Sequence, residues 1–182
     1  MSIKKVLRMG HPILRKKCDQ LTEQEIRSPE MKTLIQDMHE TMKAEKGIGL
    51  AAPQIGINKQ IAIIEMPQES ERYEEVEETP LIIVINPKLT VLDEEKQGYW
   101  EGCLSVPGLR GFVKRPRKIK VEFLDIEMEK QVLTLEGFLA TVFQHELDHL
   151  FGRLYIDHIE DKTLLSYEEE FYQFYSEQDS IE

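Results

Sequence analysis

Two histidines and a glutamate in residues 144–149 have the spacing of a metal site that hydrolyses amides. The segment reads Gln-His-Glu-Leu-Asp-His, with His145 and His149 four residues apart. On a helix, residues i and i+4 lie on one face, so both imidazoles can bind one metal ion. Glu146 follows the first histidine, where its carboxylate can reach a metal-bound water without binding the metal itself. The segment therefore predicts a metal ion with a general base beside it.

A helix must position this motif, and the flanking sequence favours one. Apolar residues recur at helical spacing from Phe138 to Leu150, and Gly152 can end the helix. The pattern can also arise by chance on a surface helix, so further residues have to support it. Cys103 is the candidate third ligand, because catalytic metal sites typically use three protein ligands. The alternative interpretation of Cys103 is a buried structural thiol.

Three segments together resemble the peptide deformylase family. They read GIGLAAPQIG at 47–56, EGCLSVPG at 101–108 and QHELDH at 144–149. The resemblance continues through Arg110 and Arg115. It implies an α+β fold in which a central metal-binding helix packs among small mixed or antiparallel sheets, followed by a C-terminal helix.

The resemblance also implies roles for residues around the metal. Its metal ligands are Cys103, His145 and His149. Glu146 is then the general acid/base, and a metal-bound water is the nucleophile. The Gln54 side chain and the Leu104 backbone N–H share the stabilisation of a tetrahedral oxyanion. From its sequence context alone, Gln54 could equally cap a loop.

A further set of positions is implied to bind the substrate. These positions are Gly47, Ile48, Gly49, Tyr99, Glu101, Gly102, Arg110, Phe138 and Val142. Gly47 and Gly49 are implied to lie along an extended peptide, and the apolar members to form the pocket for the first side chain. Each apolar member has the competing interpretation of ordinary core. Glu101 pairs with Arg115 to support the cysteine loop, and Arg110 at the mouth can bond peptide carbonyls.

The function that follows is removal of the N-terminal formyl group from formyl-methionine of newly synthesised proteins, with release of formate. The resemblance implies one divalent metal, Fe²⁺ in the cell, with Ni²⁺, Co²⁺ or Zn²⁺ possible in a purified protein. A general zinc endopeptidase is the first alternative, but such enzymes usually use histidine or glutamate as third ligand. A non-catalytic relative is the second, disfavoured because the ligands, Glu146 and Gln54 are all present.

Composition predicts a single catalytic domain, residues 1–160, followed by an acidic C-terminal helix and frayed tail, residues 161–182. The chain has 182 residues, 41% of them hydrophobic, and a formal net charge of -11. That charge argues against binding DNA through a basic face. No secretory signal or membrane-length apolar run is visible, so we expect a cytoplasmic monomer. Its expected partners are nascent formyl-methionyl chains, met transiently at the ribosome.

Other elements are predicted from period and capping. Ser28 and Pro29 start a helix that Gly47 ends, and a short helix follows Pro12. Strands are expected at 60–66, 81–86, 88–92, 118–124 and, more weakly, 132–135. A last helix is expected at 163–175, and the glutamate-rich 67–79 segment should be an exposed hairpin loop. Cys18 is expected to be an unreactive thiol without a disulfide.

Overall fold

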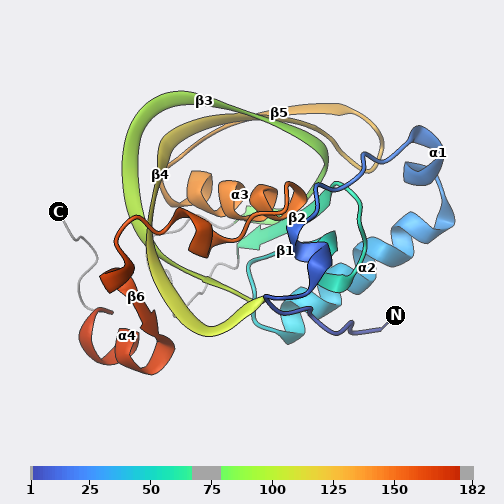
Figure 1. Ribbon diagram of the computed structural model, residues 1–182. Coiled ribbons are helices and arrows are strands. Elements are labelled where there is room, and N and C mark those ends of the chain that lie inside the picture. Colours follow the sequence, from blue (N-terminus) through green and yellow to red (C-terminus); the bar gives the residue numbers. More distant parts are fainter. Residues whose placement is uncertain (1, 67–78, 177–182) are drawn as a thin grey trace.

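A curved antiparallel sheet surrounds one central helix (Figure 1). The computed structural model describes residues 2–66 and 79–176. The strands are β1 (Gly49–Ala51), β2 (Ile61–Met66), β3 (Thr79–Cys103), β4 (Val106–Leu124), β5 (Lys130–Glu136) and β6 (Leu165–Tyr167). They pair in the order β1-β2-β3-β4-β5, and β6 adds to β4. The fold is α+β as expected, although the small sheets are hydrogen-bonded into one.

Of the helices in the described residues, only α2 and α3 are longer than seven residues. The α-helices are α1 (Glu23–Ile26), α2 (Pro29–Ala44), α3 (Gly137–Leu150) and α4 (Glu168–Phe174). The 3₁₀ turns are η1 (Pro12–Arg15), η2 (Ala52–Ile55), η3 (Tyr155–His158) and η4 (Lys162–Leu164). Within the described ranges, no helix combines the length and apolar character needed to cross a bilayer.

α3 is the predicted motif helix, and the sheet curves around it. Phe143 and Leu150 are fully buried on it and pack in one cluster with residues of β2, β4 and β5, among them Ile119. The helix ends as predicted: Gly152 has φ +75, and its N–H donates to the His149 carbonyl. α3 therefore has a fixed rotation relative to the sheet, which fixes where its histidines point.

α2 covers the other side of β1 and β2. It starts at Pro29 as predicted, although Ser28 makes no side-chain cap bond there and instead donates to the Glu25 carbonyl. Its end differs from the prediction, because the left-handed residue after the helix is Lys46 (φ 56) rather than Gly47. Gly47 still contributes to this end, since its N–H donates to the Met42 carbonyl at 2.9 Å.

The strand predictions were wrong in number and length. The segments 81–86 and 88–92 are parts of one long strand, β3, which pairs with β4 over nearly its whole length. The register shifts between Ile85 and Lys88, where Asn86 has φ 51. Such a bulge breaks the alternation of polar and apolar residues that the sequence prediction relied on. The strands at 61–66 and 130–136 agree with prediction within a few residues.

The C-terminal segment also differs from prediction. In place of one helix at 163–175, the chain forms η4, then β6, then the short α4. Residues 165–167 pair with β4, because an exposed strand edge offers unpaired backbone groups there. The expected hairpin at 67–79 falls, apart from Thr79, outside the described residues, as does most of the expected frayed tail.

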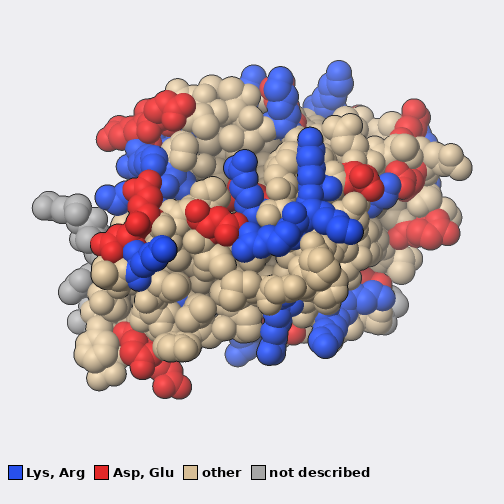
Figure 2. Space-filling model, in the orientation of Figure 1, with Lys and Arg blue, Asp and Glu red and all other residues tan. Residues whose placement is uncertain are grey.

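The negative charge is unevenly distributed over the chain. Lys and Arg side chains gather across the middle of the face shown in Figure 2. Residues 1–18 include six Lys or Arg and no Asp or Glu, whereas residues 160–182 include eight Asp or Glu and one Lys. The net charge of -11 therefore describes the whole chain and not this face.

Candidate active site

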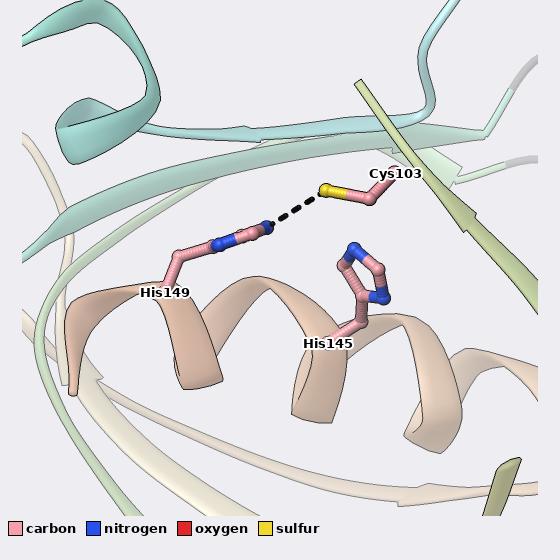
Figure 3. A group of neighbouring side chains, drawn as sticks. All are labelled: Cys103, His145 and His149. Atoms are coloured by element: carbon pink, nitrogen blue, oxygen red, sulfur yellow. Dashed lines mark hydrogen bonds between the residues drawn. The ribbon is translucent and has the colours of Figure 1, made fainter. Parts of the chain in front are cut away.

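Three side chains from two distant parts of the chain converge beside α3. His145 and His149 project from the helix toward Cys103, which ends β3 (Figure 3). One donor atom from each residue lies within 4.8 Å of the other two, and Cys103 Sγ is 3.4 Å from His149 Nε2. The i, i+4 spacing and the cysteine thus meet at one point, as the sequence predicted.

Cys103 reaches the helix because β3 and β4 form a tight hairpin. Cys103 pairs with Val106, so residues 104–105 make the turn, and a register shift precedes it at Glu101. The turn brings Ser105 against the N-terminal segment, where its carbonyl accepts a 2.7 Å bond from Met9 N–H. The loop that holds the sulfur is therefore fixed on both sides.

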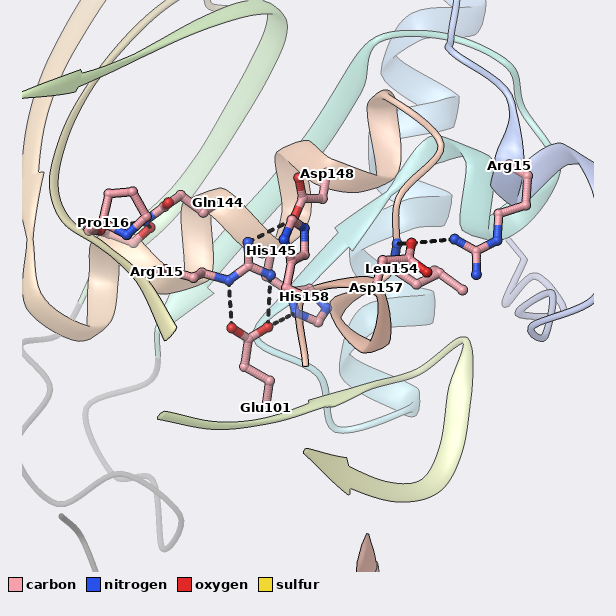
Figure 4. Close-up of polar contacts among 11 residues, drawn as sticks. Arg15, Glu101, Arg115, Pro116, Gln144, His145, Asp148, Leu154, Asp157 and His158 are labelled. Atoms are coloured by element: carbon pink, nitrogen blue, oxygen red, sulfur yellow. Dashed lines mark hydrogen bonds and ion pairs between the residues drawn. The ribbon is translucent and has the colours of Figure 1, made fainter. Parts of the chain in front are cut away.

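A buried chain of charges orients His145 (Figure 4). Its Nδ1 lies 2.7 Å from Glu101 Oε2, and Glu101 also accepts two bonds from Arg115, at 2.6 and 3.1 Å. Arg115 donates in addition to Asp148 at 2.7 Å. Burial acts to raise the pKa of Glu101, but His145 and Arg115 hold it below its usual value. The ionised carboxylate accepts a hydrogen bond from Nδ1–H, so Nε2 is the ring nitrogen that faces the cysteine.

The two histidines differ in their affinity for a proton. Burial and the charge of His145 place the pKa of His149 well below normal, so its imidazole is neutral. Burial opposes the charged form of His145 too, but hydrogen bonds with Cys103 and Glu101 raise its pKa well above normal. Of the two imidazoles, only that of His145 is therefore favoured to carry a second proton in the metal-free protein. Two imidazoles and a thiolate are ligands that Zn²⁺ and other transition metals accept, so the residues fit a metal.

Glu146 is buried next to this group without ligating geometry of its own. Its side chain is 6% exposed, and Oε2 has no hydrogen-bond partner among the described residues. Burial raises the pKa of this carboxyl to about 7. A Cβ at Gly49 would lie 2.4 Å from Glu146 Oε1, so only glycine lets β1 pass this close. A carboxyl that titrates near neutrality and faces a metal site is suited to accept and return a proton.

Gln54 faces the cysteine from η2. It is 1% exposed, its Oε1 accepts a 2.8 Å bond from Ala51 N–H, and its Nε2 lies 3.6 Å from Cys103 Sγ. Its Nε2 also donates to Ser105 Oγ at 3.2 Å. Gln54 therefore caps its loop and also presents its amide to the site. Both interpretations of Gln54 from sequence therefore apply. Its partner Ser105, which lies within the EGCLSVPG segment, was not predicted.

The predicted apolar positions lie together. Ile48 and Phe138 pack against the cluster that contains Val142, and the Tyr99 and Phe138 rings meet edge to face at 5.3 Å. Leu104, in the turn beside the cysteine, lies across from Gly47, where a Cβ would come within 3.0 Å of its side chain. The sequence positions thus share one region, and their role in binding stays a prediction.

Arg110 has a partner in the structure that the sequence analysis did not predict. It is 6% exposed, and its guanidinium donates to Glu168 of α4 at 2.6 and 3.1 Å. Sequence reasoning missed Glu168 because α4 is remote from the motifs in sequence and was expected only to belong to an acidic C-terminal helix. Cys18 has the features expected of an unreactive thiol without a disulfide. It is 3% exposed, burial raises its pKa to about 11, and both cysteines are free.

Comparison with known proteins gives one family. The polypeptide deformylase family model matches residues 3–164. The chain is 44% identical over 170 residues to the peptide deformylase of Leptospira biflexa serovar Patoc, covering 93% of this chain and 95% of the relative. It is 45% identical over 159 residues to peptide deformylase 2 of Pseudomonas syringae pv. tomato, covering 87% and 88%.

Solved structures agree with this comparison. A class I type b peptide deformylase from Acinetobacter baumannii, solved with Met-Ala-Ser bound, is similar with a TM-score of 0.83 and 34% identity, covering 87% of this chain and 99% of that one. The peptide deformylase of Thermotoga maritima is similar with a TM-score of 0.77 and 34% identity, covering 88% and 100%. The similar sequences and the similar structures are therefore proteins of the same kind, peptide deformylases.

Proposed function

The chain belongs to the polypeptide deformylase family, and we propose that it hydrolyses the formyl group from the N-terminal formyl-methionine of nascent proteins. As a peptide deformylase it is an enzyme that acts on a linear amide. The observation that carries the mechanism is the buried Glu146 carboxyl group next to the His145 ligand position, whose Oε2 has no hydrogen-bond partner among the described residues. Formate and a free amine are the products.

The ligands of the metal are Cys103, His145 and His149. When bound, the divalent metal supplies Lewis acidity, which activates water and polarises the formyl oxygen. Glu101 and Arg115 keep His145 in the tautomer and orientation that ligation needs. We expect Fe²⁺ in the cell, and Ni²⁺, Co²⁺ or Zn²⁺ in a purified sample, since affinity order alone does not decide occupancy.

Glu146 moves the proton. As a carboxylate it accepts a proton from the attacking water, and as a carboxylic acid it delivers that proton to the leaving amine nitrogen. Its burial supports this cycle, because a pKa of about 7 makes both protonation states accessible near neutral pH. Gly49 lets the carboxylate lie directly against β1.

Gln54 and the Leu104 N–H stabilise the oxyanion that develops on the formyl oxygen. The Gln54 amide is held by Ala51 and Ser105, so it is oriented before substrate arrives. Gly47 and Gly49 on one side and Glu101 and Gly102 on the other line an extended peptide.

The methionine side chain enters the apolar region of Ile48, Tyr99, Phe138 and Val142. The Acinetobacter baumannii relative was solved with a peptide that starts with methionine, which supports this choice. We place the enzyme in the cytoplasm as a monomer that meets its substrates transiently at the ribosome.

The test is formate release from a formyl-Met tripeptide by the nickel-loaded protein and by Glu146→Gln. The variant keeps the shape of the side chain but cannot shuttle a proton. We expect it to retain metal and to turn over at least about a hundredfold more slowly, the scale of general acid–base catalysis. Turnover near that of the unaltered enzyme in a metal-loaded variant would exclude this role for Glu146.

A further inference from the structure

The end of β3 has two faces with different neighbours. Glu101 and Cys103 both contact side chains of α3, whereas Trp100 packs against the rings of the C-terminal segment. Glu101 bonds His145, and Cys103 lies against His149, both on α3. One face of this short stretch therefore carries the metal site, and the opposite face must be supported by something else.

The C-terminal segment covers that opposite face. β6 pairs with β4 at Leu109, Arg110 and Gly111, directly beside the end of β3. Beyond it, the rings of Phe171 and Tyr175 lie 5.1 and 5.0 Å from the Trp100 ring. Strand pairing and aromatic packing thus hold residues 165–175 on the back of the metal-binding strand.

One ion pair links this segment to the residue next to the cysteine. The guanidinium of Arg110 has three neighbours. It donates to Glu168 at 2.6 Å, lies 5.9 Å from the centre of the Phe171 ring, and lies against the backbone of Gly102. A Cβ at Gly102 would lie 2.3 Å from Arg110 Nη1, so the guanidinium rests directly on this backbone. Glu168 decides its orientation, because both Nε and Nη2 donate to the same oxygen of that carboxylate.

We propose that Glu168 is a positioning residue for the metal site: by holding Arg110 on Gly102, it fixes the end of β3 and hence the Cys103 sulfur. This rests on the proposed function only in taking Cys103 as a ligand. The two hydrogen bonds from Arg110 to Glu168 link this carboxylate to the end of β3, so its effect on the metal site passes through the Arg110 guanidinium. Loss of the Glu168 carboxylate should therefore increase the mobility of the end of β3 and the rate at which bound metal dissociates.

The test compares two variants that remove one negative charge from α4. Glu168→Gln breaks the ion pair with Arg110. Glu169→Gln is the matched control, because Glu169 is exposed and makes no ion pair with any residue of the described ranges. Trp100, the single tryptophan of the chain, reports by its emission whether α4 remains packed.

In the metal-free protein, amide hydrogen exchange of residues 99–104 should be about two to five times faster in Glu168→Gln, the range that a half-exposed ion pair can supply. Trp100 emission should not change. With nickel bound, release to an excess of chelator should accelerate by a similar factor. Glu169→Gln should match the unaltered protein in every measurement, and Glu168→Asp should lie between the two.

Kinetics provide an independent readout. A positioning role lowers kcat for the formyl-Met tripeptide and leaves KM within about twofold, since the peptide is bound as before. A rise in KM with unchanged kcat would mean that the pair contacts substrate, and would overturn the proposal. So would exchange and nickel release equal to those of Glu169→Gln, or a shift of Trp100 emission, which would mean release of the whole helix. Exchange and metal release need no substrate, so failure of the proposed activity would be seen separately.

Discussion

Replacing Glu146 with glutamine should change the pH dependence of stability in the metal-free protein. Burial raises the pKa of this carboxyl to about 7 in the folded state, against an ordinary value of 4.5. The folded protein therefore binds more protons than the unfolded chain between these values, and its stability falls as pH rises through them. Glutamine does not titrate, so the variant lacks this loss.

The magnitude follows from the pKa. Between pH 5 and pH 8, the unaltered protein should lose roughly 2–3 kcal/mol of unfolding free energy that Glu146→Gln retains. Any cost of burying the glutamine amide is the same at every pH, so it cancels from this change. Most of the change should fall between pH 5 and pH 7, where the folded carboxyl is still protonated and the unfolded one is not.

The assay is urea unfolding of both proteins at several pH values from 5 to 8, with metal removed. Glu169→Gln, an exposed change of the same chemistry, is the control and should follow the unaltered protein. With a metal ion bound, the difference should shrink, because a nearby cation favours the ionised carboxylate. The argument would be refuted if the difference in unfolding free energy between Glu146→Gln and the unaltered protein stayed constant within about 0.5 kcal/mol from pH 5 to pH 8. A variation of that size is typical of surface substitutions.

Three further changes test the geometry of the site. Gly49→Ala places a Cβ 2.4 Å from Glu146 Oε1, so kcat should fall at least about tenfold with metal content retained; an unchanged kcat would contradict the close approach. Cys103→Ala should lose both tight metal binding and the sulfur-to-metal charge-transfer absorption of the cobalt form, and cobalt binding as strong as in the unaltered protein would remove Cys103 from the ligand set. Arg115→Met leaves the buried Glu101 carboxylate without its cation, and urea unfolding should show a loss of about 3–5 kcal/mol; stability equal to that of the unaltered protein would show that Arg115 is not needed to hold this charge.

The local part of the site was predictable because it depends on the geometry of one helix. His145 and His149 share a face of α3 whatever surrounds it, and apolar residues at helical spacing determine which face turns inward. The sequence motif around Gly49 was also informative. Glycine is required at this position because the Glu146 side chain approaches its backbone closely.

The long-range part was not predictable from residue patterns. Cys103 meets α3 only because β3 and β4 pair over their length and turn at residues 104–105. Bulges along β3 interrupt the period of two that marks a strand, so the sequence suggested short separate strands.

The C-terminal segment shows a different limit. Residues 165–167 follow no strong strand pattern and become a strand because the edge of β4 accepts them. The ion pair of Arg110 with Glu168 spans 58 residues, a distance at which no local rule applies. A resemblance to relatives placed Arg110 at the mouth of the site, but the partner that holds it had to come from the structure.

The most direct test of the proposed function is the choice among three peptides by the metal-loaded enzyme. The peptides share one sequence beginning with methionine and carry a formyl group, an acetyl group or a free amine at the N-terminus. We predict rapid release of formate from the formyl peptide, far slower release of acetate, and no cleavage of the internal amide bonds in any of the three. Cleavage of internal bonds at a rate comparable to formate release would instead indicate a general metalloprotease and contradict the proposed function.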